Sequence, residues 1–185
     1  ERIDVGLAVY MPGPASFMGK KVVQLTECSP LANVTIAVGE PHGRAAIAKR
    51  CMAAGLRLSS VVSPRAFVSS SAIVGEGVII APFASVQADA VLHQNVAINT
   101  QAIIGHHVEL GQDSVISSQA NIGGASRIGE RTYIAMGVSI KEKIAIGANT
   151  IVSMGSVVHR DLPEGVIAVG NPARPSKKND ENKVF

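Results

Sequence analysis

Residues 98–128 read INTQAIIGHHVELGQDSVISSQANIGGASRI, and an aliphatic side chain falls at every sixth position of this stretch. The spacing extends in both directions without an insertion, and all 17 positions carry Ile, Val or Leu. They are Val62, Val68, Val74, Ile80, Val86, Leu92, Ile98, Ile104, Leu110, Ile116, Ile122, Ile128, Ile134, Ile140, Ile146, Val152 and Val158. A period of six does not match the 3.6-residue period of an α-helix, so the repeat predicts short extended segments joined by corners.

Three such segments make a triangular coil of 18 residues, with the recurring aliphatic side chain pointing inward. Stacked coils place equivalent residues about 4.8 Å apart, as in parallel strands. The repeat spans residues 62–163, or five and two-thirds coils, and predicts a mostly β protein built on a parallel β-helix. In six hexads Gly follows the aliphatic position, where it relieves a steric or φ constraint at a bend. These glycines are Gly75, Gly105, Gly111, Gly123, Gly129 and Gly147.

Residues 1–61 follow a different pattern. The apolar runs Asp4–Tyr10 and Val34–Val38 suit strands, and Arg44–Ala54 suits a helix that stops at Gly55. This order predicts a small βαβ fragment in front of the β-helix. A Gly-rich dinucleotide fingerprint on the first strand is absent, which predicts that an N-terminal strand and helix are missing from this chain. Residues 164–185 are expected to form an exit loop and a tail.

The composition excludes several classes of function. Charged residues make up 17% of the chain, and the formal net charge is +3 with Lys and Arg dispersed. This balance suits an anionic small molecule rather than nucleic acid, which a clustered basic face would indicate. No apolar run approaches the roughly 20 residues needed to cross a bilayer. Cys28 and Cys51 are isolated, without metal spacing or a disulfide framework, which predicts a cytoplasmic protein without a metal.

Three stretches carry a resemblance to a known family: TIAVGEPHGRAAIAKRCMAAGLRLSSVVSPRA (35–66), NTQAIIGHHVELG (99–111) and VIAVGNPARP (166–175). With the hexads, they resemble the bacterial hexapeptide-repeat sugar acetyltransferases. That family includes sialic acid O-acetyltransferases and N-acetyltransferases of UDP-linked 4-amino sugars such as bacillosamine precursors. The resemblance implies a left-handed β-helix that binds acetyl-CoA and a Rossmann-like domain, truncated here to residues 1–61, that binds the sugar nucleotide. It also implies a homotrimer with its sites between subunits.

Acyl transfer from a thioester needs a base, and the pKa of His near 6.5 suits that role. The resemblance assigns the base to His106, which lies two residues after the inward Ile104. At His107 many relatives carry a carboxylate, so His107 is either a bystander or a contact of the substrate or of the base. Glu109 is a weaker candidate for the carboxylate that orients the base.

Backbone N–H groups at a tight glycine are the expected donors to the oxyanion of the transition state. Gly124 is the candidate, because the stretch NIGGAS follows His106 one coil later and the family places this glycine against the acetyl carbonyl.

The resemblance further implies that CoA runs along a groove walled by Met136 with Gly137 and by Met154 with Gly155, two pairs spaced 18 residues apart. Arg174 in the exit loop is the candidate for the CoA phosphates. Gly39 is the candidate for the nucleotide, because ligands of α/β folds bind at strand ends.

The favoured reading is acetyl transfer from acetyl-CoA to the amine of a nucleotide-linked amino sugar, for a surface polysaccharide or glycan. O-acetylation of a sialic acid stays open, because these residues do not distinguish an amine from a hydroxyl acceptor. A zinc lyase of the carbonic-anhydrase type needs three His on one metal, and His93, His106 and His107 lack that family's spacing. A non-catalytic β-helix scaffold is the remaining alternative.

Overall fold

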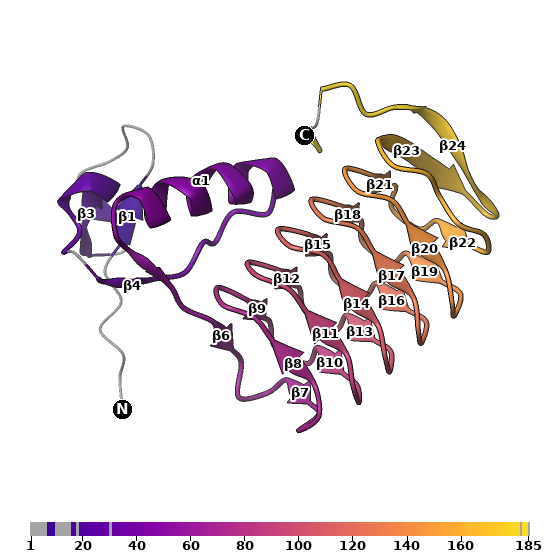
Figure 1. The fold of residues 1–185 in the computed structure, drawn as a ribbon, viewed down its shortest axis with the longest axis horizontal. Coiled ribbons are helices and arrows are strands. Elements are labelled where there is room, and N and C mark those ends of the chain that lie inside the picture. Colours follow the sequence, from indigo (N-terminus) through magenta and orange to yellow (C-terminus); the bar gives the residue numbers. More distant parts are fainter. Residues whose placement is uncertain (1–6, 10–15, 18, 30, 182, 185) are drawn as a thin grey trace.

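The computed structural model describes residues 7–9, 16–17, 19–29, 31–181 and 183–184. Its main body is a β-helix of about six turns with three flat faces, seen from the side in Figure 1. The first face contains β7 (Phe67–Val68), β10 (Ser85–Val86), β13 (Ile103–Ile104), β16 (Asn121–Ile122), β19 (Ser139–Ile140) and β22 (Val157–Val158). The second contains β8 (Ile73–Val74), β11 (Val91–Leu92), β14 (Glu109–Leu110), β17 (Arg127–Ile128) and β20 (Ala145–Ile146). The third contains β6 (Val61–Val62), β9 (Ile79–Ile80), β12 (Ala97–Ile98), β15 (Val115–Ile116), β18 (Tyr133–Ile134) and β21 (Ile151–Val152).

Each strand of the repeat pairs in parallel with the strand 18 residues away. Ile104, for example, lies between Val86 and Ile122 in one ladder. The inward aliphatic side chains from Ile80 to Val158 are at most 4% exposed, and they form one continuous core. Burying one such side chain stabilises the fold by about 1.5–3 kcal/mol, so the six-residue pattern accounts for the stability of the coil. The predicted β-helix is therefore confirmed.

A left-handed backbone residue marks nearly every corner, three positions after the inward aliphatic residue. The non-glycine residues in this conformation within the repeat are Phe83, Asp89, Asn95, Gln101, His107, Asp113, Gln119, Ala125, Arg131, Lys143 and Asn149, with φ between 51° and 62°. The repeat glycines have a different role. A Cβ on Gly105 would lie 2.7 Å from the carbonyl oxygen of Ile122, so these glycines are required by the close approach of the next coil.

The segment before the repeat contains α1 (Pro41–Ala53), which begins three residues earlier than predicted. The Glu40 carboxylate caps it by accepting hydrogen bonds from the N–H groups of His42 and Gly43, and Pro41 occupies the first turn. Gly55, with φ 75°, follows its C-terminus as predicted.

Two small sheets accompany this helix. One contains β1 (Leu7–Val9), β3 (Lys20–Gln24) and β2 (Ser16–Phe17), with η1 (Leu25–Glu27) after β3; the other pairs β4 (Asn33–Val34) with β5 (Arg57–Leu58). The predicted strand Val34–Val38 is thus reduced to Asn33–Val34. The prediction Asp4–Tyr10 falls partly outside the described residues, and β1 is its described part.

A buried arginine joins α1 to the corner between the second and third faces. The Arg44 side chain is fully buried and donates hydrogen bonds to the backbone carbonyl and the Oδ1 atom of Asn95, at 2.7 and 2.8 Å. Asn95 donates in turn to Asp113 at 2.6 Å. Burial lowers the pKa of Arg44 to about 10, against the opposing effect of Asp113, and it raises the pKa of Asp113 itself. This polar cluster therefore fixes the helix to the coil, and Figure 1 shows α1 along one edge of the β-helix.

The chain leaves the β-helix through the hairpin of β23 (Val166–Gly170) and β24 (Ala173–Lys178), which extends the third face. The Asn179 side chain then donates to the carbonyl of Asn149 at 2.8 Å, so the exit segment returns to the corner that α1 covers.

Candidate active site

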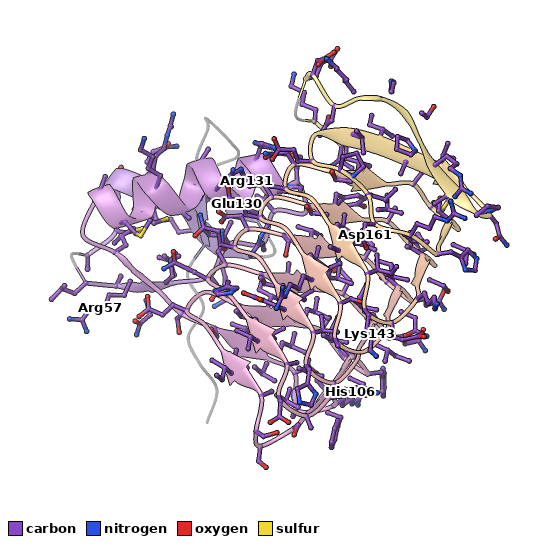
Figure 2. All side chains as sticks on the ribbon, turned by 45° about the vertical axis from the view of Figure 1, so that its right-hand side comes forward. Arg57, His106, Glu130, Arg131, Lys143 and Asp161 are labelled. Atoms are coloured by element: carbon purple, nitrogen blue, oxygen red, sulfur yellow. The ribbon has the colours of Figure 1, made fainter. Side chains whose placement is uncertain are left out.

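His106 lies on the corner between the first and second faces, two residues after β13. Its carbonyl accepts a hydrogen bond from Ala125 N–H at 2.8 Å, and His107 N–H donates to the carbonyl of Ala88 at 2.9 Å, so both neighbouring coils hold this corner. The side chain is exposed. Figure 2 shows it on the side of the β-helix away from Glu130 and Arg131, which lie beside α1. The position suits a base that meets its substrate at the surface.

Gly124 lies directly under the imidazole of His106, one coil further along. A Cβ on Gly124 would come within 2.6 Å of His106 Nε2 and 2.7 Å of Cε1. Any residue other than glycine would therefore displace the ring from its position. The Gly124 carbonyl accepts from Lys143 N–H at 2.9 Å, which holds the residue in the coil. Among the described residues no carbonyl accepts a hydrogen bond from the Gly124 N–H. The structure thus brings the predicted base and the predicted oxyanion donor together.

His107 contacts His106 directly. The two Nδ1 atoms lie 3.0 Å apart, and the rings meet edge to face with centroids 5.2 Å apart. The left-handed φ of 57° at His107 allows this, because it turns the side chain back along the corner instead of to the opposite face of a strand. On its other side, His107 Nε2 lies 3.5 Å from Asp89 Oδ2. Of the two open interpretations of His107, the geometry favours a contact of the base.

The Glu109 carboxylate points elsewhere. It accepts from His93 Nε2 at 2.9 Å and lies 3.8 Å from Arg127 Nε. Glu109 occupies an outward position of β14, so its side chain lies on the second face and not at the corner. Glu109 was predicted to orient His106, but the contacts of its carboxylate among the described residues are to His93 and Arg127. The carboxylate that reaches the histidine pair is Asp89, which the sequence analysis missed. The signal was available, because Asp89 stands 18 residues before His107 and occupies the same turn position.

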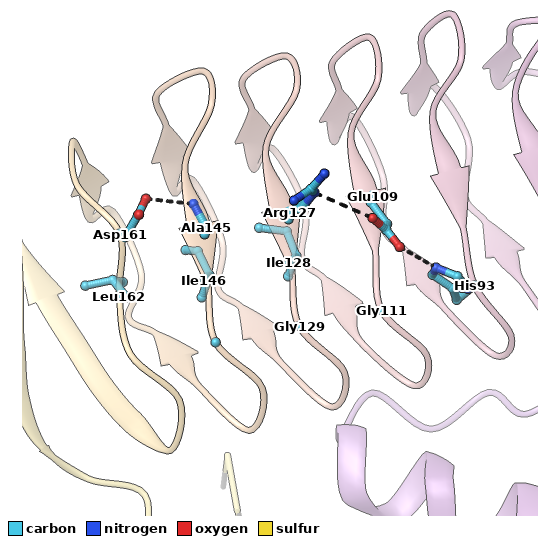
Figure 3. A pocket seen from close by; sticks show the side chains of 11 residues that line it. His93, Glu109, Gly111, Arg127, Ile128, Gly129, Ala145, Ile146, Asp161 and Leu162 are labelled. Atoms are coloured by element: carbon cyan, nitrogen blue, oxygen red, sulfur yellow. Dashed lines mark hydrogen bonds and ion pairs between the residues drawn. The ribbon is translucent and has the colours of Figure 1, made fainter.

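The second face is hollowed into an open groove of about 420 Å³, shown in Figure 3. Small residues, namely glycines and Ala145, line part of the groove. The larger polar side chains that line it are His93, Glu109, Arg127 and Asp161. The His93 ring and the Arg127 guanidinium both contact Glu109, and Asp161 accepts from Ala145 N–H at 2.8 Å. The groove is therefore internally paired and does not by itself form an anion site.

The residues predicted for the CoA groove lie at another corner, between the third and first faces. They stack as the spacing of 18 required, because Gly155 N–H donates to the Met136 carbonyl at 3.0 Å. Met136 and Met154 are 49% and 70% exposed, and a Cβ on Gly137 or Gly155 would meet open space. Within one chain this corner is not the corner of His106. A single subunit therefore does not bring the predicted base and the predicted CoA wall together.

The remaining predicted residues lie apart from both corners. Arg174 is on β24, where its guanidinium donates to the Ala173 carbonyl at 2.9 Å and is otherwise exposed. Gly39 is exposed in the loop before α1, and the structure has no strand end there. No group of three His, Cys, Asp or Glu suited to a metal occurs in the described part of the chain. In the described residues, no helix has the length and apolar character of a membrane span.

The uninterrupted hexads and the three-faced coil define the class of hexapeptide-repeat β-helix proteins. Neither a protein-family model nor a curated protein sequence matches the chain. Solved structures do. The acetyltransferase domain of PglB from Neisseria gonorrhoeae, in complex with acetyl coenzyme A, is 32% identical, with 92% of this chain and 85% of that chain covered and a TM-score of 0.86. PerB from Caulobacter crescentus, in complex with CoA and GDP-perosamine, is 30% identical over 85% of this chain and 78% of that chain, with a TM-score of 0.81.

WeeI from Acinetobacter baumannii is 25% identical, with 87% of this chain and 80% of that chain covered and a TM-score of 0.82. The chain belongs to the hexapeptide-repeat sugar N-acetyltransferases. The suspected family is thereby confirmed, and the protein is an acyltransferase.

Proposed function

We propose that this protein transfers the acetyl group of acetyl-CoA to the amine of a nucleotide-linked amino sugar. The observation that carries the proposal is the imidazole of His106 held over Gly124 at an exposed corner. The similar structures support the substrate classes: PerB was solved with CoA and GDP-perosamine, and the PglB domain with acetyl coenzyme A.

The chemistry needs one proton acceptor and one oxyanion donor. The sugar amine attacks the thioester carbonyl while His106 Nε2 removes the proton that the nitrogen loses. The Gly124 N–H donates to the oxyanion of the tetrahedral state, and the bond from Lys143 N–H to the Gly124 carbonyl holds this residue in the coil. The C–S bond then breaks, and the proton passes from His106 to the departing thiolate. The products are the N-acetylated sugar and free CoA.

The second wall of the site comes, in this proposal, from another copy of the chain. The corner of Met136–Gly137 and Met154–Gly155 is glycine-lined, open and stacked along the coil axis, as a pantetheine channel requires. Three left-handed β-helices in a closed ring place this corner of one copy beside the His106 corner of the next. Arg174 then meets the CoA phosphates.

We further propose that residues 1–61 belong to a Rossmann-like domain that binds the nucleotide near Gly39. Residues 62–163 form the acetyl-CoA-binding β-helix, and residues 164–185 form the exit segment. The free thiols of Cys28 and Cys51 suit a reducing cytoplasm, where the N-acetylated sugar would serve as a building block for a surface polysaccharide or glycan.

The test is a screen of GDP- and UDP-linked amino sugars with acetyl-CoA, read as release of free thiol. We expect turnover with at least one amino sugar, and mass spectrometry should find the acetyl group on nitrogen. His106→Ala serves as the control for non-enzymatic acetylation. Turnover with a sialic acid and with no amino sugar would contradict the assignment of the acceptor. Failure of acetyl-CoA to bind in calorimetry would contradict the proposal as a whole.

A further inference from the structure

The catalytic corner contains more than a base and an oxyanion donor. Asp89 contacts His107, and His107 contacts His106, with 3.5 Å between Asp89 Oδ2 and His107 Nε2 and 3.0 Å between the two Nδ1 atoms. We infer that Asp89 and His107 are positioning residues that fix the tautomer of His106. This inference rests on the proposed function, because it concerns how that function's base is prepared.

The first step of the argument is the proton count of the two rings. A neutral imidazole has one nitrogen that donates and one that accepts. At 3.0 Å, one Nδ1 atom of the pair must carry the hydrogen and the other must present its lone pair. Two arrangements are possible, and they leave opposite groups at the Nε2 atoms.

In the productive arrangement His106 carries its hydrogen on Nδ1 and donates to His107. Its Nε2 atom then presents a lone pair over Gly124, ready to accept a proton from the amine. His107 in this case carries its hydrogen on Nε2, the atom that lies 3.5 Å from Asp89 Oδ2. In the opposite arrangement His106 Nε2 is already protonated and cannot act as a base, and the lone pair of His107 Nε2 faces a carboxylate oxygen.

Asp89 decides between these arrangements, because an ionised carboxylate accepts hydrogen bonds but donates none. It favours the hydrogen on His107 Nε2, and through the Nδ1 contact it favours the lone pair on His106 Nε2. The same carboxylate stabilises the positive charge that His106 acquires on accepting the proton. This is the logic by which an aspartate orients the histidine of a serine hydrolase, extended here by one imidazole.

The backbone holds the three side chains in register. Asp89 and His107 occupy the same left-handed turn position in adjacent coils, with φ 58° and 57°. The Asp89 N–H donates to Ser71 Oγ at 3.1 Å, and the His107 N–H donates to the Ala88 carbonyl. Asp89 and His107 side chains are 53% and 62% exposed, so their pair adds little to stability, and its effect is on the tautomer.

The repeat itself supplies variants that should fold. Ala125 and Gln119 stand at the same left-handed turn position in the following corners, so Ala and Gln are compatible with this backbone. His107→Ala and Asp89→Ala remove the positioning contacts. His107→Gln keeps them, because an amide can accept from His106 Nδ1 and donate to Asp89. Glu164→Gln, which removes an exposed carboxylate near the C-terminal end of the coil, is the control for loss of charge.

In steady-state kinetics we expect kcat to fall about 10- to 100-fold in His107→Ala and about 10-fold in Asp89→Ala, as for other partners that orient a histidine. Both KM values should stay within about twofold, His107→Gln should recover most of the rate, and Glu164→Gln should match wild type. Unchanged kcat in both alanine variants would overturn the inference, as would a KM effect with normal kcat.

Nitrogen-15 spectra of labelled imidazoles test the same point without any substrate. We expect His106 in wild type to show a protonated Nδ1 and an unprotonated Nε2, and Asp89→Ala to shift it toward the other tautomer. A wild-type His106 protonated on Nε2 would overturn the inference. If the protein transfers no acetyl group to any sugar but the spectra follow the expected pattern, the proposed function fails while the positioning contact stands.

Discussion

Two corners of the same β-helix have the same backbone and opposite contents. The corner after the first face is filled: His106 covers Gly124, and His107 joins it to Asp89. The corner after the third face is open: a Cβ on Gly137 or Gly155 would meet no atom within 4 Å. Because the inward side chains stabilise the coil, the residues at each corner can vary without loss of the fold. The filled corner suits chemistry, and the open corner suits the binding of an extended molecule.

The largest difference between the corners should appear on removal of the base. His106→Ala deletes the proton acceptor and leaves the open corner intact, so kcat should fall about 100- to 10,000-fold with the affinity for acetyl-CoA little changed. Steady-state kinetics measures kcat, and calorimetry measures the affinity for acetyl-CoA. A rate within a few-fold of wild type would mean that another residue is the base.

A pair of adjacent glycines separates chemistry from folding at the filled corner. Gly124→Ala places a methyl group against the His106 ring, which can swing away, so kcat should fall about 10- to 100-fold with a normal thermal melt. Gly123→Ala places its methyl group against the backbone nitrogen of Glu142, which cannot move freely, so that variant should lose stability instead. If both variants lose stability and neither loses kcat beyond that, the absence of a side chain at Gly124 is not needed for the function of His106.

The open corner should respond to bulk in binding. Phe83 adopts φ 62° at the position equivalent to Gly137 three coils earlier, so Gly137→Phe fits the backbone. We expect it to raise the KM for acetyl-CoA at least about tenfold and to leave the KM for the sugar nucleotide nearly unchanged. Met154→Ala, which removes an exposed side chain, should change neither value more than about twofold. An unmoved KM for acetyl-CoA would place the groove elsewhere.

The third corner, which binds α1, should give the smallest effect. Burial raises the pKa of Asp113, so the folded state binds that proton more tightly than the unfolded chain does. Its contribution to stability is then fully present below the unfolded pKa of about 3.9 and is lost as pH rises through the folded value. Asp113→Asn keeps an acceptor for Asn95 and should remove this dependence, with the free energy of unfolding at pH 7 changed by at most about 1 kcal/mol.

Urea unfolding of wild type and Asp113→Asn at pH 4 and pH 7 measures this difference. A much larger loss of stability at pH 7 would show that the negative charge itself is needed to hold Arg44.

The sequence predicted the β-helix because the inward positions repeat without interruption from Val62 to Val158. It predicted the start of α1 poorly, because the cap at Glu40 and the proline after it carry no helical periodicity. The pairing of His106 with Gly124 followed from the 18-residue coil. The same 18-residue register places Asp89 beside His107, but it does not by itself show that the two side chains touch. Glu109 was predicted to orient the base, and its outward position on β14 directs it to His93 instead.

The central claim is that the filled corner of one copy works with the open corner of another, and complementation tests it most directly. His106→Ala and Gly137→Phe subunits carrying different tags are expressed together, and complexes that bear both tags are purified. They are assayed with acetyl-CoA, at a concentration too low to support Gly137→Phe alone, and with the amino sugar found in the screen. The account predicts one intact site in each mixed trimer, about one third of its sites, so activity returns although each parent is nearly inactive. Mixed complexes as inactive as their parents would contradict it.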